Sequence, residues 1–297
     1  MAEVGEFRGV TVAMVTPLGE DGSVDEGALR DHVNDLVESG VQVLLPCGTT
    51  GESATLRPEE QRRVIAVTVE AADGRVAVMA GAGTNATADA CDLARAAASE
   101  GAAAVLTVAP YYNKPTQEGL FRHFRAVRDA AGIPLFVYNV PGRTSVNIRA
   151  ETTLRLAEID GVWGVKEASG DLAQMADVLR GRPGGFLVLS GDDELTLPLL
   201  ALGGDGVVSV VANEAPGLMS RLVAAGLDGD FETARRLHFR LLGLMRANFV
   251  ETNPIPVKAA MERLGKFPAH YRLPLTPLGD AGGQVLDRAL RSAGLLS

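Results

Sequence analysis

Cysteine and lysine are both scarce in this chain of 297 residues, and each scarcity limits the available chemistry. The two cysteines, Cys47 and Cys91, are too few for a disulfide framework and lack the spacing of metal ligands. The four histidines also lack ligand spacing, so we expect no metal site and a protein suited to the reducing cytoplasm. Any reaction that needs a lysine amine has only four candidates. They are Lys114, Lys166, Lys258 and Lys266.

Other absences narrow the class of protein. No apolar run reaches the length of about 18 residues that a membrane span requires. The first residues, which include Glu3 and Glu6, lack the basic and apolar regions of a signal peptide. The net charge of −9 provides no basic surface for nucleic acid. Glycine-rich segments occur, but none completes a nucleotide-binding motif between a strand and a helix. We therefore expect no membrane and no nucleic-acid partner.

Eight short, almost continuously apolar runs recur along the chain, with amphipathic segments between them. Such runs are typical of strands that are buried on both faces of a parallel sheet. Several of the intervening segments end at glycine, which is a common signal for the end of a helix. The pattern predicts an α/β fold, a (β/α)8 TIM barrel, with a doubly wound sheet as the alternative. The runs span residues 9–17, 41–47, 76–81, 103–110, 134–140, 161–168, 186–191 and 206–213.

The pattern changes after Asn213, where strand-like runs cease and helical segments follow to the end of the chain. One of these helices completes the barrel, and the others form a small C-terminal helical extension. We therefore expect a catalytic barrel at 1–225 and a helical domain at 226–297.

Lys166 ends an apolar strand, where its charged form is costly to bury. Active-site residues of such barrels lie at the carboxyl ends of the strands. Burial lowers the pKa of a lysine, and a neutral amine can attack a ketone to form a Schiff base. The alternatives are an ion pair with Glu167 or a side chain that reaches out to solvent.

Tyr138 ends the neighbouring strand, where its phenol could transfer protons as a general acid and base. The alternative is a tyrosine of the core whose hydroxyl is hydrogen-bonded.

The turn 48–52, Gly-Thr-Thr-Gly-Glu, offers hydroxyls and backbone N–H groups to an anion, or else simply caps a helix. Arg143 could hold a carboxylate, although an exposed arginine is common on any surface. The acidic run 192–194 is interpreted as a helix cap rather than a metal site.

Taken together, these motifs resemble the dihydrodipicolinate synthase / N-acetylneuraminate lyase family of class I aldolases. The resemblance extends over almost the whole chain, and seven stretches carry it. They are GTTGESATL (48–56), YYNKPTQEGL (111–120), YNVPGRT (138–144), GVKEASGD (164–171), LSGDDE (189–194), GGDGVVSVVAN (203–213) and NPIPVKAAMERLG (253–265).

The resemblance implies a role for each matching residue. Lys166 would form a Schiff base with pyruvate, while Tyr138, Thr49 and Tyr112 would relay protons, with Tyr112 supplied by a neighbouring subunit. Thr49 and Thr50 would hold the carboxylate of pyruvate, and Arg143 that of aspartate semialdehyde. No metal or organic cofactor is needed. The backbone at Gly191 and Val208 would line the same pocket.

The Thr49–Thr50 pair and the arginine of Pro141-Gly142-Arg143-Thr144 favour the synthase branch of the family. The alternatives are a pyruvate-dependent lyase or aldolase acting on a sugar acid, and a non-catalytic homologue. A member of this family is expected to be a homo-oligomer, most simply a tetramer built as a dimer of dimers.

A candidate allosteric site for lysine is also implied by the resemblance. Two further positions, Pro58 and Gln61, stand where some lysine-sensitive members carry histidines, so we expect inhibition by lysine to be weak or absent. The residues that match the site itself are Ser53, Ala54, Asn85, Asp89 and Tyr111.

Overall fold

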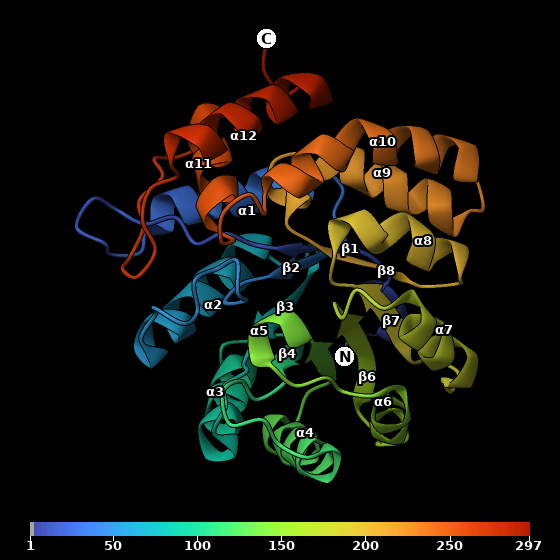
Figure 1. Ribbon diagram of the computed structural model, residues 1–297. Coiled ribbons are helices and arrows are strands. Elements are labelled where there is room, and N and C mark those ends of the chain that lie inside the picture. The colour runs from blue at the N-terminus through green and yellow to red at the C-terminus, as the bar shows by residue number, and fades with distance from the viewer. Residues whose placement is uncertain (1–2) are drawn as a thin grey trace.

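The computed structural model describes residues 3–297, and its eight parallel strands form one closed barrel (Figure 1). Each strand pairs with its neighbours in chain order, and β1 closes the ring by pairing with β8. The predicted barrel is therefore confirmed, and the doubly wound alternative is excluded. The strands are β1 (Gly9–Ala13), β2 (Val43–Leu45), β3 (Ala77–Gly81), β4 (Ala104–Val108), β5 (Leu135–Asn139), β6 (Val162–Glu167), β7 (Leu187–Ser190) and β8 (Gly206–Ser209).

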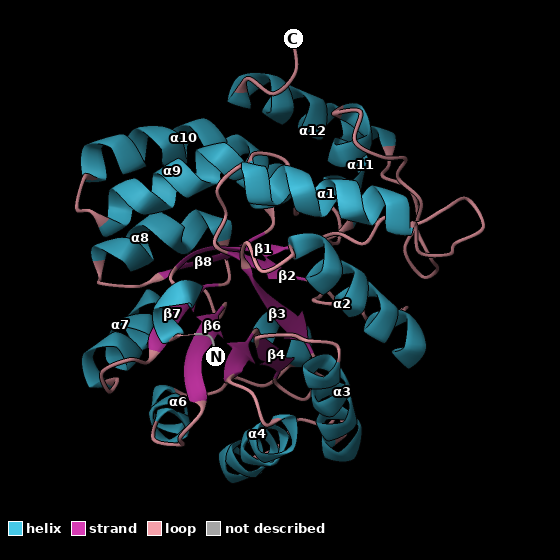
Figure 2. Cartoon of the chain, turned by 180° about the vertical axis from the view of Figure 1, so that it is seen from behind, coloured by secondary structure: helices cyan, strands magenta, loops and turns pink. Residues whose placement is uncertain are grey.

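Helices surround the strands in a ring, and further helices lie outside it on one side, as two opposite views show (Figures 1 and 2). The 3₁₀ helices are η1 (Val4–Phe7), η2 (Asp193–Leu195) and η3 (Val211–Asn213). The α-helices are α1 (Glu26–Glu38), α2 (Pro58–Ala72), α3 (Thr87–Ser99), α4 (Gln117–Ala131), α5 (Pro141–Thr144), α6 (Ala150–Ala157), α7 (Leu172–Gly181), α8 (Thr196–Ala201), α9 (Pro216–Leu227), α10 (Phe231–Ala247), α11 (Ile255–Arg263) and α12 (Asp280–Ala293).

Successive side chains along each strand point alternately into the barrel and toward the helices, so the protein has two hydrophobic cores. One set of side chains fills the barrel interior, where Phe7 of η1 lies 5.2 Å from Phe136 and 5.8 Å from Trp163 between ring centroids. The other set packs the outside of the strands against the helices. On β6 this places Lys166 with the interior set and Glu167 outside it, because successive side chains point to opposite faces.

The C-terminal helices pack on the barrel. Helix α9 contacts β1 and α8, α10 packs against α9 and α12, and α11 packs against α12. The expected division between residues 225 and 226 falls within the last turn of α9. We retain 226–297 as a proposed helical domain that begins in this turn. Within the described residues, none of the helices combines the length and the apolar character needed to cross a bilayer.

Candidate active site

Lys166 and Tyr138 are paired in register on β6 and β5, at the carboxyl ends of their strands. Each side chain is buried, and the Lys166 Nζ lies 4.1 Å from the centre of the Tyr138 ring. Both line a small cavity of about 40 Å³ together with Thr49, Leu106 and Val108. The structure therefore brings together three of the four residues expected to be catalytic.

Burial lowers the pKa of Lys166 from 10.5 to about 8, although the carboxylates of Asp192 and Asp193 act in the opposite direction. Glu167 does not form the ion pair that was the alternative interpretation of this lysine. Its carboxylate accepts hydrogen bonds from Asn139 and from the backbone N–H of Ser169 on the other face of the strand. Lys166 is thus a buried amine facing a cavity, with a neutral form accessible near physiological pH.

Burial also raises the pKa of Tyr138, from 10 to about 12. Arg143 and the Thr49 side chain oppose this shift, and Asp192 adds to it. The phenol is therefore neutral at physiological pH and can donate a proton or pass one on.

Gly191 lies against the aliphatic part of Lys166. A Cβ atom at this position would lie 2.6 Å from the Ala168 Cβ and 3.1 Å from the Lys166 Cε. A side chain here would clash with Ala168 and crowd the aliphatic part of Lys166, so the glycine leaves room for both. Val208 is buried in β8 and packs in the same interior cluster as Tyr138.

The turn that carries Thr49 and Thr50 differs from its expected form. It does not lead directly into a helix, because α2 begins only at Pro58 with Arg57 as its N-cap. Hydrogen bonds inside the turn close it, from the Gly51 N–H to the Gly48 carbonyl and from the Glu52 N–H to the Thr49 carbonyl.

Among residues 3–297, no protein acceptor is bonded to the backbone N–H groups of Thr49 and Thr50. These two N–H groups and the two hydroxyls are the donors that an anion requires.

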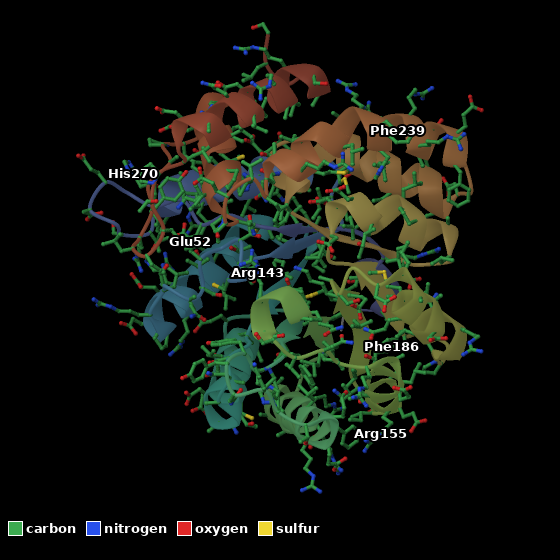
Figure 3. All side chains as sticks on the ribbon, viewed as in Figure 1. Glu52, Arg143, Arg155, Phe186, Phe239 and His270 are labelled. Carbon is green, nitrogen blue, oxygen red and sulfur yellow. The ribbon has the colours of Figure 1, made fainter. Side chains whose placement is uncertain are left out.

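A larger cavity of about 800 Å³ adjoins the small one and shares Thr49, Ser53, Gly83 and Val108 with it. Arg143, on the short helix α5 that follows β5, lines this larger cavity (Figure 3). Its guanidinium is exposed, yet it influences the pKa values of both Tyr138 and Lys166. Arg143 is therefore part of the entrance to the site.

Tyr112 is not in the cavity of its own chain. Its side chain is 89% exposed and its φ of 72° lies in the left-handed region.

The larger cavity is lined by four of the residues expected to bind lysine, namely Ser53, Ala54, Asp89 and Tyr111. Asn85 does not line it, but its carbonyl accepts a hydrogen bond from the Asn113 side chain.

The acidic run 192–194 also differs from expectation, since no side chain of this run caps a helix. The Asp193 carboxylate is buried and accepts hydrogen bonds from the backbone N–H groups of Val210 and Val211, which fixes the loop after β8. Among residues 3–297, no three His, Cys, Asp or Glu side chains are grouped as a metal ion would require.

Sequence reasoning missed one buried cluster beside the site. The sequence presents Lys258 only as one of four lysines, but the side chain is fully buried and its Nζ lies 2.5 Å from the Glu52 Oε1. The signal was present in the segment Ile255–Met261, because a lysine stands there among apolar residues on every side of the helix.

The fold and the site define a (β/α)8 barrel with a buried amine at its mouth, beside a phenol and a turn with unbonded N–H groups, an arrangement suited to Schiff-base chemistry. The sequence profile of the Dihydrodipicolinate synthetase family matches residues 6–293, and the chain belongs to this family.

The chain is 52% identical to a 4-hydroxy-tetrahydrodipicolinate synthase of Salinibacter ruber, over 96% of this chain and 94% of the relative. It is 50% identical to the enzyme of the same name from Koribacter versatilis, over 98% and 97% of the two chains. A crystal structure of DHDPS from Cyanidioschyzon merolae with lysine bound superposes with a TM-score of 0.96 at 43% identity, covering 98% of this chain and 99% of that chain.

Proposed function

We propose that the protein is a 4-hydroxy-tetrahydrodipicolinate synthase, which condenses pyruvate with L-aspartate 4-semialdehyde in the diaminopimelate route to lysine. The observation that carries the proposal is the Lys166 amine, buried beside Tyr138 and facing a small cavity next to the Thr49–Thr50 turn. The relatives of the same name, about half identical over almost the full length, support the same activity.

In the proposed reaction, neutral Lys166 attacks the ketone of pyruvate and water is lost, which leaves an iminium bound to the enzyme. The iminium withdraws electrons from the methyl group, and removal of a methyl proton gives an enamine. Tyr138 and Thr49 transfer protons during these steps. The enamine carbon then forms a bond with the aldehyde carbon of the second substrate. The amine of that substrate displaces Lys166, closes the ring and restores the free enzyme.

The two cavities match the two substrates. The small cavity at Lys166 suits a compact oxo acid, whose carboxylate would accept hydrogen bonds from the Thr49–Thr50 turn. The larger cavity leads to it and carries Arg143, whose guanidinium can bind the carboxylate of the semialdehyde through two parallel hydrogen bonds. Gly191 and the Val208 backbone would line the pyruvate pocket.

An assay with pyruvate and aspartate semialdehyde, run beside pyruvate-dependent cleavage of candidate sugar acids, tests the proposal. We expect turnover with the semialdehyde and little with sugar acids. Arg143→Ala should weaken use of the semialdehyde but leave trapping of pyruvate by borohydride nearly unchanged. Efficient cleavage of a sugar acid without condensation would favour the lyase alternative instead.

Tyr112 supports a second part of the proposal, the oligomer. Tyr112 is 89% exposed and lines neither cavity of its own chain, which supports a role in the proton relay of another copy. We propose a homotetramer in which pairs of subunits exchange Tyr112. Sedimentation at assay concentration tests this, and a fully active monomer would contradict it. The proposed location is the cytoplasm.

Regulation by lysine is proposed to be weak. Ser53, Ala54, Asp89 and Tyr111 lie around the larger cavity, and Asn85 lies beside the loop that carries Tyr111.

Two neighbouring positions weaken such a site. Pro58 offers no polar side chain, and the Gln61 amide already donates to the Ser53 and Leu56 carbonyls. Two lost contacts of about 0.5–1.5 kcal/mol each would weaken lysine binding by about 5- to 150-fold. An inhibition curve with L-lysine measures this, and strong inhibition below millimolar concentration would refute it.

A further inference from the structure

The C-terminal segment makes a direct contact with the turn that is proposed to bind the pyruvate carboxylate. The Asn253 Nδ2 donates a hydrogen bond of 3.0 Å to the Thr50 Oγ1, although the two residues are 203 positions apart. Both side chains are buried, so water cannot easily replace the bond.

This contact determines what the Thr50 hydroxyl can do. A hydroxyl carries one proton to donate and lone pairs that accept. Because the Asn253 N–H occupies an acceptor position on Thr50, the hydroxyl proton remains available to another group. A carboxylate can only accept hydrogen bonds, so it requires Thr50 in this donor orientation.

A buried ion pair fixes the same turn at its other end. The Lys258 Nζ lies 2.5 Å from the Glu52 Oε1, and the two side chains are 0% and 1% exposed. Burial lowers the pKa of Lys258, and the Glu52 carboxylate opposes that shift. Lys258 also lies 5.2 Å above the Tyr271 ring, which comes from the loop after α11.

The backbone conformation of the turn explains why it needs contacts from other segments to hold it in place. Cys47 and Glu52 have φ values of 57° and 56°, in the left-handed region that residues other than glycine adopt at a cost. Such a conformation persists when surrounding contacts enforce it. Figure 3 places Glu52 at the side of the barrel where α1, α2 and α11 lie in Figure 1. The contacts to the turn come from Asn253, just before α11, and from Lys258 within it.

We propose that Asn253 is a positioning residue for the carboxylate-binding turn, and that the Lys258–Glu52 pair anchors this turn to the C-terminal segment. The inference rests on the proposed function in one respect, namely that the turn receives the carboxylate of pyruvate. Asn253 acts through Thr50 and does not itself contact the substrate.

Trapping with cyanoborohydride over a range of pyruvate concentrations tests Asn253 directly. For Asn253→Ala we expect the pyruvate concentration at half-maximal trapping to rise by about 5- to 50-fold, as the loss of an oriented contact to a charged ligand predicts. Trapping of methyl pyruvate, which has no carboxylate, should change by less than about twofold on the same principle. An unchanged pyruvate dependence would overturn the proposal.

Asn248→Ala is the matched control. Asn248 also belongs to the C-terminal segment, is buried, and uses its Nδ2 for a single side-chain hydrogen bond, but its partner is Glu214 rather than the turn. A merely structural role for Asn253 predicts equal effects of the two substitutions on trapping. The proposal predicts that only the change at Asn253 weakens pyruvate relative to methyl pyruvate.

Asn253→Asp keeps the shape of the side chain and reverses the hydrogen bond. An ionised aspartate would accept the Thr50 proton, so pyruvate should be trapped even less well than in Asn253→Ala. Binding as in the unmodified enzyme would contradict the assigned direction of the bond.

The anchor is tested with Lys258→Met and with the double variant Glu52→Gln/Lys258→Met. We expect the double variant to recover thermal stability, because it leaves no unpaired charge, and yet to need more pyruvate for trapping. A double variant that traps pyruvate as the unmodified enzyme does would refute the anchoring role.

The assay also separates this inference from the proposed function. If the unmodified enzyme traps pyruvate but does not condense it with aspartate semialdehyde, the proposed function fails and the positioning test still stands. If condensation occurs and Asn253→Ala behaves like Asn248→Ala, only the positioning inference fails.

Discussion

Two buried lysines, Lys166 at the mouth of the barrel and Lys258 in the C-terminal segment, show how context decides the use of the same amine. Burial lowers the pKa of each. Lys258 is bonded to the Glu52 carboxylate, whereas Lys166 faces a cavity and has no ion-pair partner among residues 3–297.

The difference assigns a separate role to each lysine. A carboxylate at bonding distance holds Lys258 in its charged form, which cannot act as a nucleophile but can fix two segments together. Lys166 has no carboxylate at bonding distance, and Asp192 and Asp193 offset its desolvation only in part, which makes its neutral form accessible. A low exposed fraction therefore does not identify a reactive lysine unless its partners are also known.

The largest expected effect is the loss of covalent trapping in Lys166→Ala. The amine is the proposed nucleophile, so pyruvate and borohydride should leave no adduct on this variant, and turnover should vanish. Mass spectrometry of the digested protein detects the adduct, and steady-state kinetics measures turnover. An adduct on Lys258 in either protein would break the comparison between the two lysines.

Tyr138→Phe should be folded but slower by about 10²- to 10⁴-fold, which is the usual contribution of a general acid–base group. Lys258 also lies over a phenol ring, that of Tyr271, but the Tyr271 hydroxyl donates its proton to the Ile255 carbonyl. Steady-state kinetics with both proposed substrates checks the effect. Turnover close to that of the unmodified enzyme would remove Tyr138 from the relay.

Replacement of Lys258 should affect the stability of the protein more than replacement of Lys166, whereas activity depends more on Lys166. Lys258→Met leaves the Glu52 carboxylate buried without its partner and should lower the free energy of unfolding by about 3–5 kcal/mol. Lys166→Met removes a desolvated amine that has no such partner, so stability should be unchanged or higher. Denaturant unfolding measures both. Equal losses would show that Lys166 also has a structural partner.

The smallest effect is a pH dependence of trapping. With a pKa lowered to about 8, Lys166 is mostly charged below that pH and mostly neutral above it. The trapping rate should therefore rise by about tenfold from pH 7 and level off above pH 9, since one pH unit below the pKa about a tenth of the amine is neutral. An inflection near the ordinary lysine value would show that burial does not lower the pKa of Lys166.

The barrel could be predicted because its signal is local and repeated. Each strand, for example Leu135–Asn139 or Val162–Glu167, lies within one of the apolar runs that the sequence shows, and a helix follows it. The rule that active sites lie at the carboxyl ends of barrel strands then placed Lys166 and Tyr138 in one region. Their pairing in register agrees with that prediction.

The sequence located the turn at 48–52 and the acidic run 192–194, but it did not predict their conformations and contacts correctly. Their form depends on partners that are distant in the chain, such as Asn253 for Thr50 and Val210 for Asp193. A local motif cannot show whether an aspartate caps the next helix or receives N–H groups from another loop.

The sequence by itself determined the alternation of strands and helices, the position of Lys166 at the carboxyl end of a strand and the scarcity of lysines that made it a candidate. These follow from side-chain periodicity and composition, which are properties of neighbouring residues. Only the tertiary structure decided that Lys166 lacks a carboxylate partner while Lys258 has one, and that Asn253 orients Thr50. Pairing and desolvation depend on the distances between segments that lie as many as 206 residues apart in the chain.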